Sequence, residues 1–258
     1  MSRQPAPSAR SGRSPVIYVI AVVAIAAVIA GGYGIWYLFL RPAGPAALAD
    51  ATLPPVPGAT AGATAIPLAS GGVDGTWNVD TSIGTFTGVS DTSGNFVGYR
   101  VQEQLAGIGA NTAVGRTPKV TGSLTIAGTK VTAVDITADM TALQSDDSQR
   151  DNQLRNNGIQ FSQFPTATFK LTSPIDLGSI PADGKEISVT AAGQLTLHGV
   201  TKDVQIALRA KLSGSTIVVS GSLPIAFADY SIVKPNSFKV LSIDDNGTME
   251  LQLFFTHT

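Results

Sequence analysis

The histidine, serine and acidic side chains are the residues that could do chemistry in this sequence, and their spacing favours no reaction. The two histidines, His198 and His257, are far apart in a chain that has no cysteine. A zinc site, by comparison, needs three or four protein ligands. The serines include no Gly-x-Ser-x-Gly elbow and no visibly paired base. We therefore expect no enzymatic activity, no metal and no other cofactor.

His198 itself lies in a stretch that is typical of a hairpin turn, Leu197-His198-Gly199-Val200. We expect it to have a structural role there, because an imidazole can bond the backbone of a turn. The side chains of Thr196 and Thr201 and nearby carbonyl groups are alternative partners.

Acidic residues gather around one arginine between Asp146 and Asp151. They could form an acid–base pair or a cation site. However, acidic side chains are also favourable at the start of a helix, where they face the positive end of its dipole. We prefer this second interpretation, because Ser145 or Asp146 can cap a helix over 145–157 that Gly158 ends. The apolar face of this helix is thin, so we expect it to lie across an opening or an edge.

Apolar and polar residues alternate along much of the chain after residue 72, which is typical of antiparallel strands. One hairpin is predicted over 120–140, and a second one turns at 198–202. A last pair of strands covers 223–227 and then resumes after a predicted tight turn at Asn246-Gly247. Many short strands with one surface helix indicate an all-β protein with a closed barrel, because closure removes exposed strand edges.

An uninterrupted apolar run covers residues 16–40. About 25 helical residues extend roughly 37 Å, which is enough to cross a hydrocarbon core of about 30 Å as a transmembrane anchor. Three arginines precede the run and one follows it. The positive-inside rule then predicts a single-pass plasma membrane protein with residues 1–15 in the cytoplasm and the C-terminal part outside.

The alternative is a signal peptide that is cleaved after Ala47-Leu48-Ala49. We prefer the uncleaved anchor, because the apolar cores of signal peptides are shorter, about 7–15 residues, and lie close to the cleavage site.

Residues 41–72 are rich in Pro, Ala, Gly and Thr and predict an extended linker to a single domain over 73–258. The whole chain has a formal net charge of −1, and only 14% of its residues are charged. Without a basic cluster to neutralise phosphates, we expect no binding to nucleic acid.

Two segments resemble the YceI-like family. Residues 146–170 are similar to its Arg-Asp-x-x-Leu…Phe-Pro-x-x-x-Phe pattern, and 193–202 to its Gly-x-Leu-Thr-x-His-Gly-Val-Thr-Lys signature. The resemblance implies a lipocalin-like, eight-stranded antiparallel barrel that holds a polyisoprenoid or another long-chain amphiphile, and it implies a homodimer. The chain departs from the family at Asp203, where a proline is usual, and at 228–231, which lack an arginine.

Nine residues are candidates for contact with such a ligand. The aromatic residues around Pro165, with Leu154 and Ile159 just upstream, either line a ligand or plug one end of the barrel. The remaining candidates come from alternating positions of predicted strands, and alternation identifies one face without telling which face is inside. The candidates are Leu154, Ile159, Phe161, Phe164, Phe169, Leu195, Leu197, Phe227 and Tyr230.

The sequence therefore predicts a membrane-anchored, extracytoplasmic protein that binds a polyisoprenoid or other long-chain lipid as a carrier, buffer or scavenger. The alternative is a structural or interaction module of the cell envelope whose barrel is filled by its own side chains. Burial of apolar groups contributes about 0.8 kcal/mol per methylene, so a chain of four isoprene units needs no specific polar contact to bind.

Overall fold

The computed structural model describes residues 15–35, 45–48, 53–56, 72–235 and 240–257. The chain divides into two units, Met1–Pro42 and Ala43–Thr258. The first unit contains α1 (Pro15–Ile35), which covers most of the predicted apolar run. Residues 36–40 of that run lie outside the described residues. The part of the chain whose placement is described contains no helix that is both long and apolar enough to cross a bilayer.

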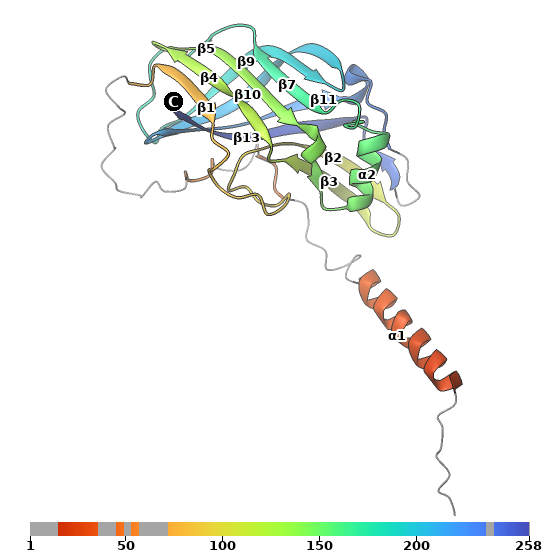
Figure 1. Cartoon of the computed structure of the whole chain (residues 1–258). Coiled ribbons are helices and arrows are strands. Elements are labelled where there is room, and N and C mark those ends of the chain that lie inside the picture. The colour runs from red at the N-terminus through yellow and green to blue at the C-terminus, as the bar shows by residue number, and fades with distance from the viewer. Residues whose placement is uncertain (1–14, 36–44, 49–52, 57–71, 236–239, 258) are drawn as a thin grey trace, which may run out of the picture. The chain divides into compact units, whose positions relative to one another are not determined.

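The described part of the second unit consists of antiparallel strands and short helical segments (Figure 1). The helical segments are η3 (Met140–Ala142), α2 (Ser148–Asn156) and η4 (Phe227–Tyr230). The strands are β1 (Gly75–Val79), β2 (Phe96–Leu105), β3 (Gly109–Thr117), β4 (Val120–Ala127), β5 (Lys130–Asp139), β6 (Gln144–Ser145), β7 (Thr166–Leu171), β8 (Ile175–Asp176), β9 (Glu186–Leu197), β10 (Val200–Ser213), β11 (Thr216–Ala226), β12 (Val240–Ile243) and β13 (Asn246–His257).

Eight of these strands close into a barrel in the order β1-β4-β5-β7-β9-β10-β11-β13. The ring closes where β13 pairs with β1, from Trp77 opposite His257 to Val79 opposite Phe255. The other end of β13 pairs with β2, which continues into β3 and β6. The predicted antiparallel eight-stranded barrel is therefore confirmed.

The two predicted hairpins are present as β4–β5 and β9–β10. The predicted tight turn at Asn246-Gly247 is wrong, because Asn246 already begins β13 and pairs with Ala226 of β11. The strand before it, β12, pairs with β2 and not with β13. The chain does not reverse there, because β12 and β13 both run antiparallel to β2 and pair with successive parts of it.

The predicted helix near residue 150 is present as α2, but its cap is Asp147, and neither Ser145 nor Asp146. The Asp147 carboxylate accepts hydrogen bonds from the backbone N–H groups of Gln149 at 2.8 Å and Arg150 at 3.3 Å. Within α2 the buried residue is Leu154. The helix is thus attached to the barrel by one apolar side chain and by polar contacts, as its thin apolar face predicts.

The outward face of β13 is buried as deeply as its inward face. Phe254 is fully buried, and Glu250 and Gln252 are each 1% exposed. The loop that precedes β2 covers part of this face, because the Gln252 amide donates to the carbonyl groups of Thr92 and Gly94.

Two pieces of the expected linker cover the rest of this face, and we call them the strap (residues 45–48 and 53–56). The backbone N–H of Leu48 donates to Glu250 at 3.0 Å, and Arg209 donates to the carbonyl of Leu48 at 2.8 Å. Leu53 and Val56 pack with Phe254. Two pieces of the predicted extended linker over 41–72 therefore pack against the barrel.

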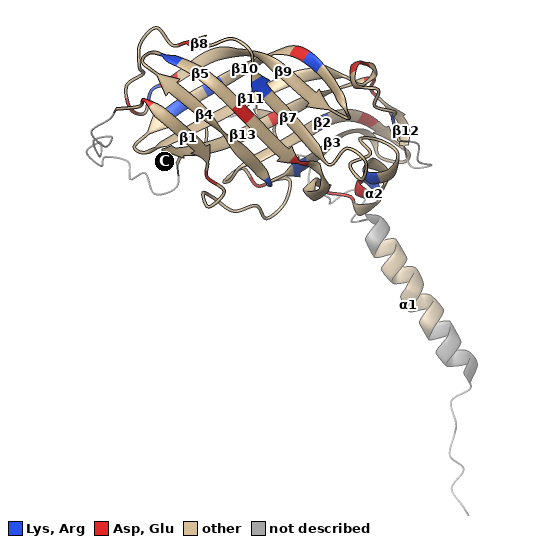
Figure 2. Cartoon of the chain, turned by 45° about the horizontal axis from the view of Figure 1, so that its top comes forward, with Lys and Arg blue, Asp and Glu red and all other residues tan. Residues whose placement is uncertain are grey.

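Under these covering segments lies a buried ion pair. Arg116 is 0% exposed, and its Nη2 lies 3.8 Å from Glu250 Oε2, while its guanidinium stacks over the Phe96 ring at 3.9 Å. Burial lowers the pKa of Arg116, although the Glu250 carboxylate opposes that shift. Arg100 adds a second contact to Glu250 at 3.2 Å. Elsewhere, Figure 2 shows acidic and basic residues in small groups over the described strands and loops.

Candidate functional site

The inward faces of the barrel strands enclose an apolar cavity. Inward-facing residues alternate along each strand, so that Leu253 of β13 lies opposite Val219 of β11, and Leu208 of β10 lies opposite Val189 of β9. All four line the cavity, together with residues of β2, β4, β5 and β7. Among the described residues that line it, Lys185 and Lys211 are the only charged ones.

The cavity has a volume of about 170 Å³. One water needs about 10–15 Å³ of such space, so the cavity has room for on the order of ten water-sized groups. Pockets for drug-sized ligands are larger, about 300–1,000 Å³. The cavity is therefore suited to a slender hydrocarbon chain and not to a bulky ligand.

One end of the cavity lies where the β4–β5 and β10–β11 turns meet the loop after β8. We take this end as the mouth, because lining residues are exposed to solvent there. Leu177, Ile180 and Pro181 of that loop line the cavity, and Ile180 is 38% exposed. Lys185 is exposed beside them, just before β9. An apolar rim with a basic residue can guide an amphiphile into the bore.

The opposite end of the barrel is filled by side chains. Phe161 is fully buried there and packs in one cluster with Leu154 of α2 and with Met140 and Leu143. The Arg155 guanidinium stacks over the Phe161 ring at 4.8 Å. The aromatic residues were expected either to line a ligand or to plug one end of the barrel. Phe161 fits the second interpretation.

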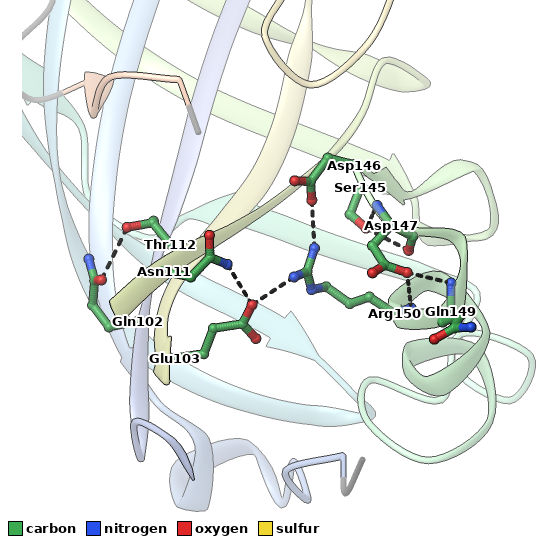
Figure 3. Close-up of polar contacts among 9 residues, drawn as sticks. All are labelled: Gln102, Glu103, Asn111, Thr112, Ser145, Asp146, Asp147, Gln149 and Arg150. Atoms are coloured by element: carbon green, nitrogen blue, oxygen red, sulfur yellow. Dashed lines mark hydrogen bonds and ion pairs between the residues drawn. The ribbon is translucent and has the colours of Figure 1, made fainter. Parts of the chain in front are cut away.

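A polar cluster fastens α2 over this filled end (Figure 3). The Arg150 guanidinium donates to Glu103 Oε1 at 2.7 Å and to Asp146 Oδ1 at 2.6 Å. The Asn111 amide donates to the same Glu103 oxygen at 2.7 Å. Burial tends to lower the pKa of Arg150, but the nearby Glu103 and Asp146 carboxylates outweigh it and raise that pKa. The Arg150 contacts support a structural role for the acidic cluster.

The Tyr99 hydroxyl lies near this cluster and inside the barrel wall. It has no hydrogen-bond partner among the described residues, and burial raises the pKa of Tyr99. Its ring lies over Gly115 of the neighbouring strand, where a Cβ would come within 2.3 Å of ring atom Cε1. A neutral phenol is thereby held at the filled end.

His198 has the structural role that was expected for it. Its backbone has a positive φ of 51° at the β9–β10 turn, and its Nδ1–H donates to the Tyr230 carbonyl at 2.8 Å. Its Nε2 lies 3.2 Å from Gln160 Oε1, and its ring packs edge-on against Phe164 at 4.4 Å. The partner is thus a carbonyl of η4, whereas Thr196 and Thr201 bond each other.

Two of the nine predicted ligand-contact residues, Phe169 and Leu195, line the cavity. Four others belong to, or pack against, the main apolar cluster of the barrel without lining the cavity, and three lie around the β9–β10 turn and η4. The first group is Leu154, Ile159, Phe161 and Leu197, and the second is Phe164, Phe227 and Tyr230. Contact with a ligand stays a prediction for all nine residues.

Sequence reasoning missed most of the cavity wall. One missed set lies on β13, where Met249, Leu251, Leu253 and Phe255 all line the cavity. Their alternation is visible in the sequence and was the available signal. It identifies one face of a strand, but it does not tell which part of that face borders open space.

The barrel resembles known proteins in both sequence and fold. A UPF0312 protein of Vibrio vulnificus is 40% identical over 75 residues, which are 29% of this chain and 36% of the relative. A UPF0312 protein of Vibrio parahaemolyticus is 40% identical over 74 residues, 28% of this chain and 35% of the relative. The chain thus matches only about a third of the length of these relatives.

A polyisoprenoid binding domain from Saccharophagus degradans, implicated in plant cell wall breakdown, has a similar fold. Its TM-score is 0.53 at 18% sequence identity, and the match covers 71% of this chain and 99% of that domain. The YceI-like domain family matches residues 77–255, which extend from β1 to near the end of β13. With most of its length in that match, this chain belongs to the YceI-like family.

Proposed function

We propose that the barrel binds the hydrocarbon chain of an isoprenoid or another long-chain lipid and serves as its carrier, buffer or scavenger. The observation that carries this proposal is the apolar cavity between the inward strand faces, with Phe169 and Leu195 in its wall. Support also comes from the similar fold of the Saccharophagus degradans domain, which is described as polyisoprenoid binding.

Burial of hydrocarbon is sufficient to drive this binding. Each methylene group that leaves water contributes about 0.8 kcal/mol, so two or three isoprene units contribute on the order of 8–12 kcal/mol. Association costs about 4–15 kcal/mol in lost freedom, so the net affinity depends on how much of the chain is enclosed. A polar contact would then only orient the head group.

The direct test is organic extraction of the purified full-length protein followed by mass spectrometry of the lipids. We expect a stoichiometric amount of a hydrophobic chain to be released. A barrel that is empty in several preparations, and that takes up no prenyl lipid when offered it, would contradict the proposal and favour a structural module of the cell envelope.

We further propose that residues 16–40 anchor the chain in the plasma membrane and that the barrel is extracytoplasmic. The support is the apolar run with three arginines before it and one after it. Because the chain has no cysteine, single-cysteine variants can test this directly. We expect a membrane-impermeant maleimide to label Ser90→Cys, an exposed barrel position, in intact cells, whereas Ser11→Cys should react only after lysis. The reverse pattern would contradict the proposed orientation.

A further inference from the structure

The cavity occupies only part of the barrel interior. Its wall includes Leu195, Ile206 and Met249, and these residues also belong to, or pack against, a second apolar cluster. That cluster continues away from the cavity to Leu223, Ile225 and Tyr230, all of which are buried. The open space therefore ends where this cluster begins.

Phe169 stands at this boundary. It faces inward from β7, between Ile136 of β5 and Leu195 of β9. It lines the cavity and also packs against the second cluster. No other aromatic residue among the described side chains does both, because Phe255 lines the cavity without packing on that cluster.

A glycine on the neighbouring strand determines how Phe169 lies. A Cβ at Gly193 would come 2.4 Å from Cζ and 2.5 Å from Cε2 of Phe169. The ring therefore occupies the space that a side chain at position 193 would fill, and it leans from β7 across β9. Because the ring fills this space against the backbone at Gly193, it resists displacement toward β9.

We propose that the Phe169 ring is the stop against which the ligand ends, so that it sets the longest hydrocarbon chain the cavity accepts. This inference rests on the proposed function. A methylene group is similar in size to a water molecule, so the cavity holds on the order of ten to fifteen carbons, or two to three isoprene units. The preferred ligands are therefore short prenyl or acyl chains, and longer chains must leave their remainder outside the mouth.

Substitution of Phe169 tests the stop. Phe169→Ala removes six ring carbons, slightly more than the five carbons of one isoprene unit, at the closed end of the cavity. Phe169→Leu is a milder variant that keeps the strand apolar if the alanine variant does not fold. The matched control is Phe161→Leu, which alters an aromatic residue that is fully buried and does not line the cavity.

The full-length protein and its variants are placed in phospholipid nanodiscs and offered geraniol, farnesol, geranylgeraniol and octaprenol, which differ only in the number of isoprene units. Bound alcohol is counted by native mass spectrometry. Partition of each alcohol into the bilayer is the same for every variant. The ratio of variant to wild-type occupancy at each chain length therefore reports only the contribution of the cavity to binding.

We expect wild-type occupancy to rise from geraniol to farnesol and then to level off or fall. Phe169→Ala should raise occupancy by geranylgeraniol at least about tenfold over the wild type and leave that by geraniol unchanged, while Phe161→Leu follows the wild type. Equal profiles for Phe169→Ala and the wild type, or full enclosure of octaprenol by the wild type, would overturn the chain-length inference alone. Uptake of no alcohol by any variant would overturn the proposed function as well.

Discussion

The two faces of β13 are both buried, but they are buried in different ways. Inward, Leu251 and Leu253 border a cavity whose wall is almost entirely apolar. Outward, Glu250 and Gln252 are polar, and each is enclosed by hydrogen-bond partners from the strap or from the loop before β2. One strand thus separates a loosely filled apolar interior from a tightly filled polar layer.

The two faces of β13 therefore contribute differently: the inward face borders the cavity, and the outward face stabilises the fold. Side chains that border open space lack contacts on one side and contribute less dispersion energy than fully packed ones. The outward layer of β13 offsets that loss, because Phe254 is fully packed there and Asn95 accepts a hydrogen bond from its backbone N–H. The barrel can keep room for a ligand because its stability is gained on the outside.

The largest effect should come from the outward ion pair. Glu250→Ala leaves the buried Arg116 guanidinium without its carboxylate, and it removes the acceptor of Leu48 and Arg100. Loss of one partner of a buried pair costs about 3–5 kcal/mol. We expect a decrease of that size in the free energy of unfolding, measured by urea titration of the β-sheet circular dichroism. A change below about 1 kcal/mol would show that the outward layer is dispensable.

Truncation of one apolar residue on each face of β13 compares the two faces directly. Phe254→Ala should lower the free energy of unfolding by about 3–5 kcal/mol, because it opens a void in a fully packed site. Leu251→Ala should lower it by about 2 kcal/mol, because its neighbours already border the cavity. Both values come from the same urea titrations. Equal losses at the two positions would remove the distinction between the faces.

Within the strap, Leu53→Ala should cost about 1–2 kcal/mol. Leu53 is 3% exposed against Phe254, but the strap can detach in part and relieve the void. Pro55→Ala is the control, since Pro55 is exposed in the same segment and surface substitutions stay within about 0.5 kcal/mol. If both variants unfold like the wild type, the strap adds no stability.

The smallest effect should be a pH dependence from the loop before β2. Asp91 accepts hydrogen bonds from the backbone and hydroxyl groups of Ser93 and Thr87. Burial raises the pKa of Asp91, but these bonds outweigh it and lower the pKa below 3.8. A lowered pKa adds stability above the unfolded value that is lost as the pH falls through the folded value.

We therefore expect the thermal midpoint of the wild type to fall below about pH 4 more steeply than that of Asp91→Asn. The difference should be small, since this carboxylate is largely solvated and screened. Parallel slopes for the two proteins between pH 6 and pH 3 would indicate that Asp91 does not contribute.

The closed barrel could be predicted from sequence because its signals are local. Alternation and turn residues specify the β4–β5 and β9–β10 hairpins, and the acidic residues after Ser145 indicate a helix near 150, although its cap is Asp147. The docking of the strap could not be predicted, because it depends on Arg100, Arg209 and Glu250. These residues come from three strands and meet only after the barrel has closed.

The candidate site was predictable only in part for a related reason. Phe161 and Phe169 lie in one aromatic segment, yet Phe169 borders the cavity while Phe161 fills the opposite end. Sequence periodicity specifies which side of the wall a residue is on, but not its depth along the bore. That depth is determined by the shear of the whole barrel, which combines the register of every strand pair.

The strand that completes the ring follows all the other barrel strands in the sequence. β13 pairs with β1, β2 and β11, so a nascent polypeptide that stops before residue 246 leaves three strands with unpaired edges. Until β13 has left the ribosome, the chain presents open hydrogen-bonding edges to its surroundings, and it depends on chaperones or on its own speed of closure to avoid association with other chains.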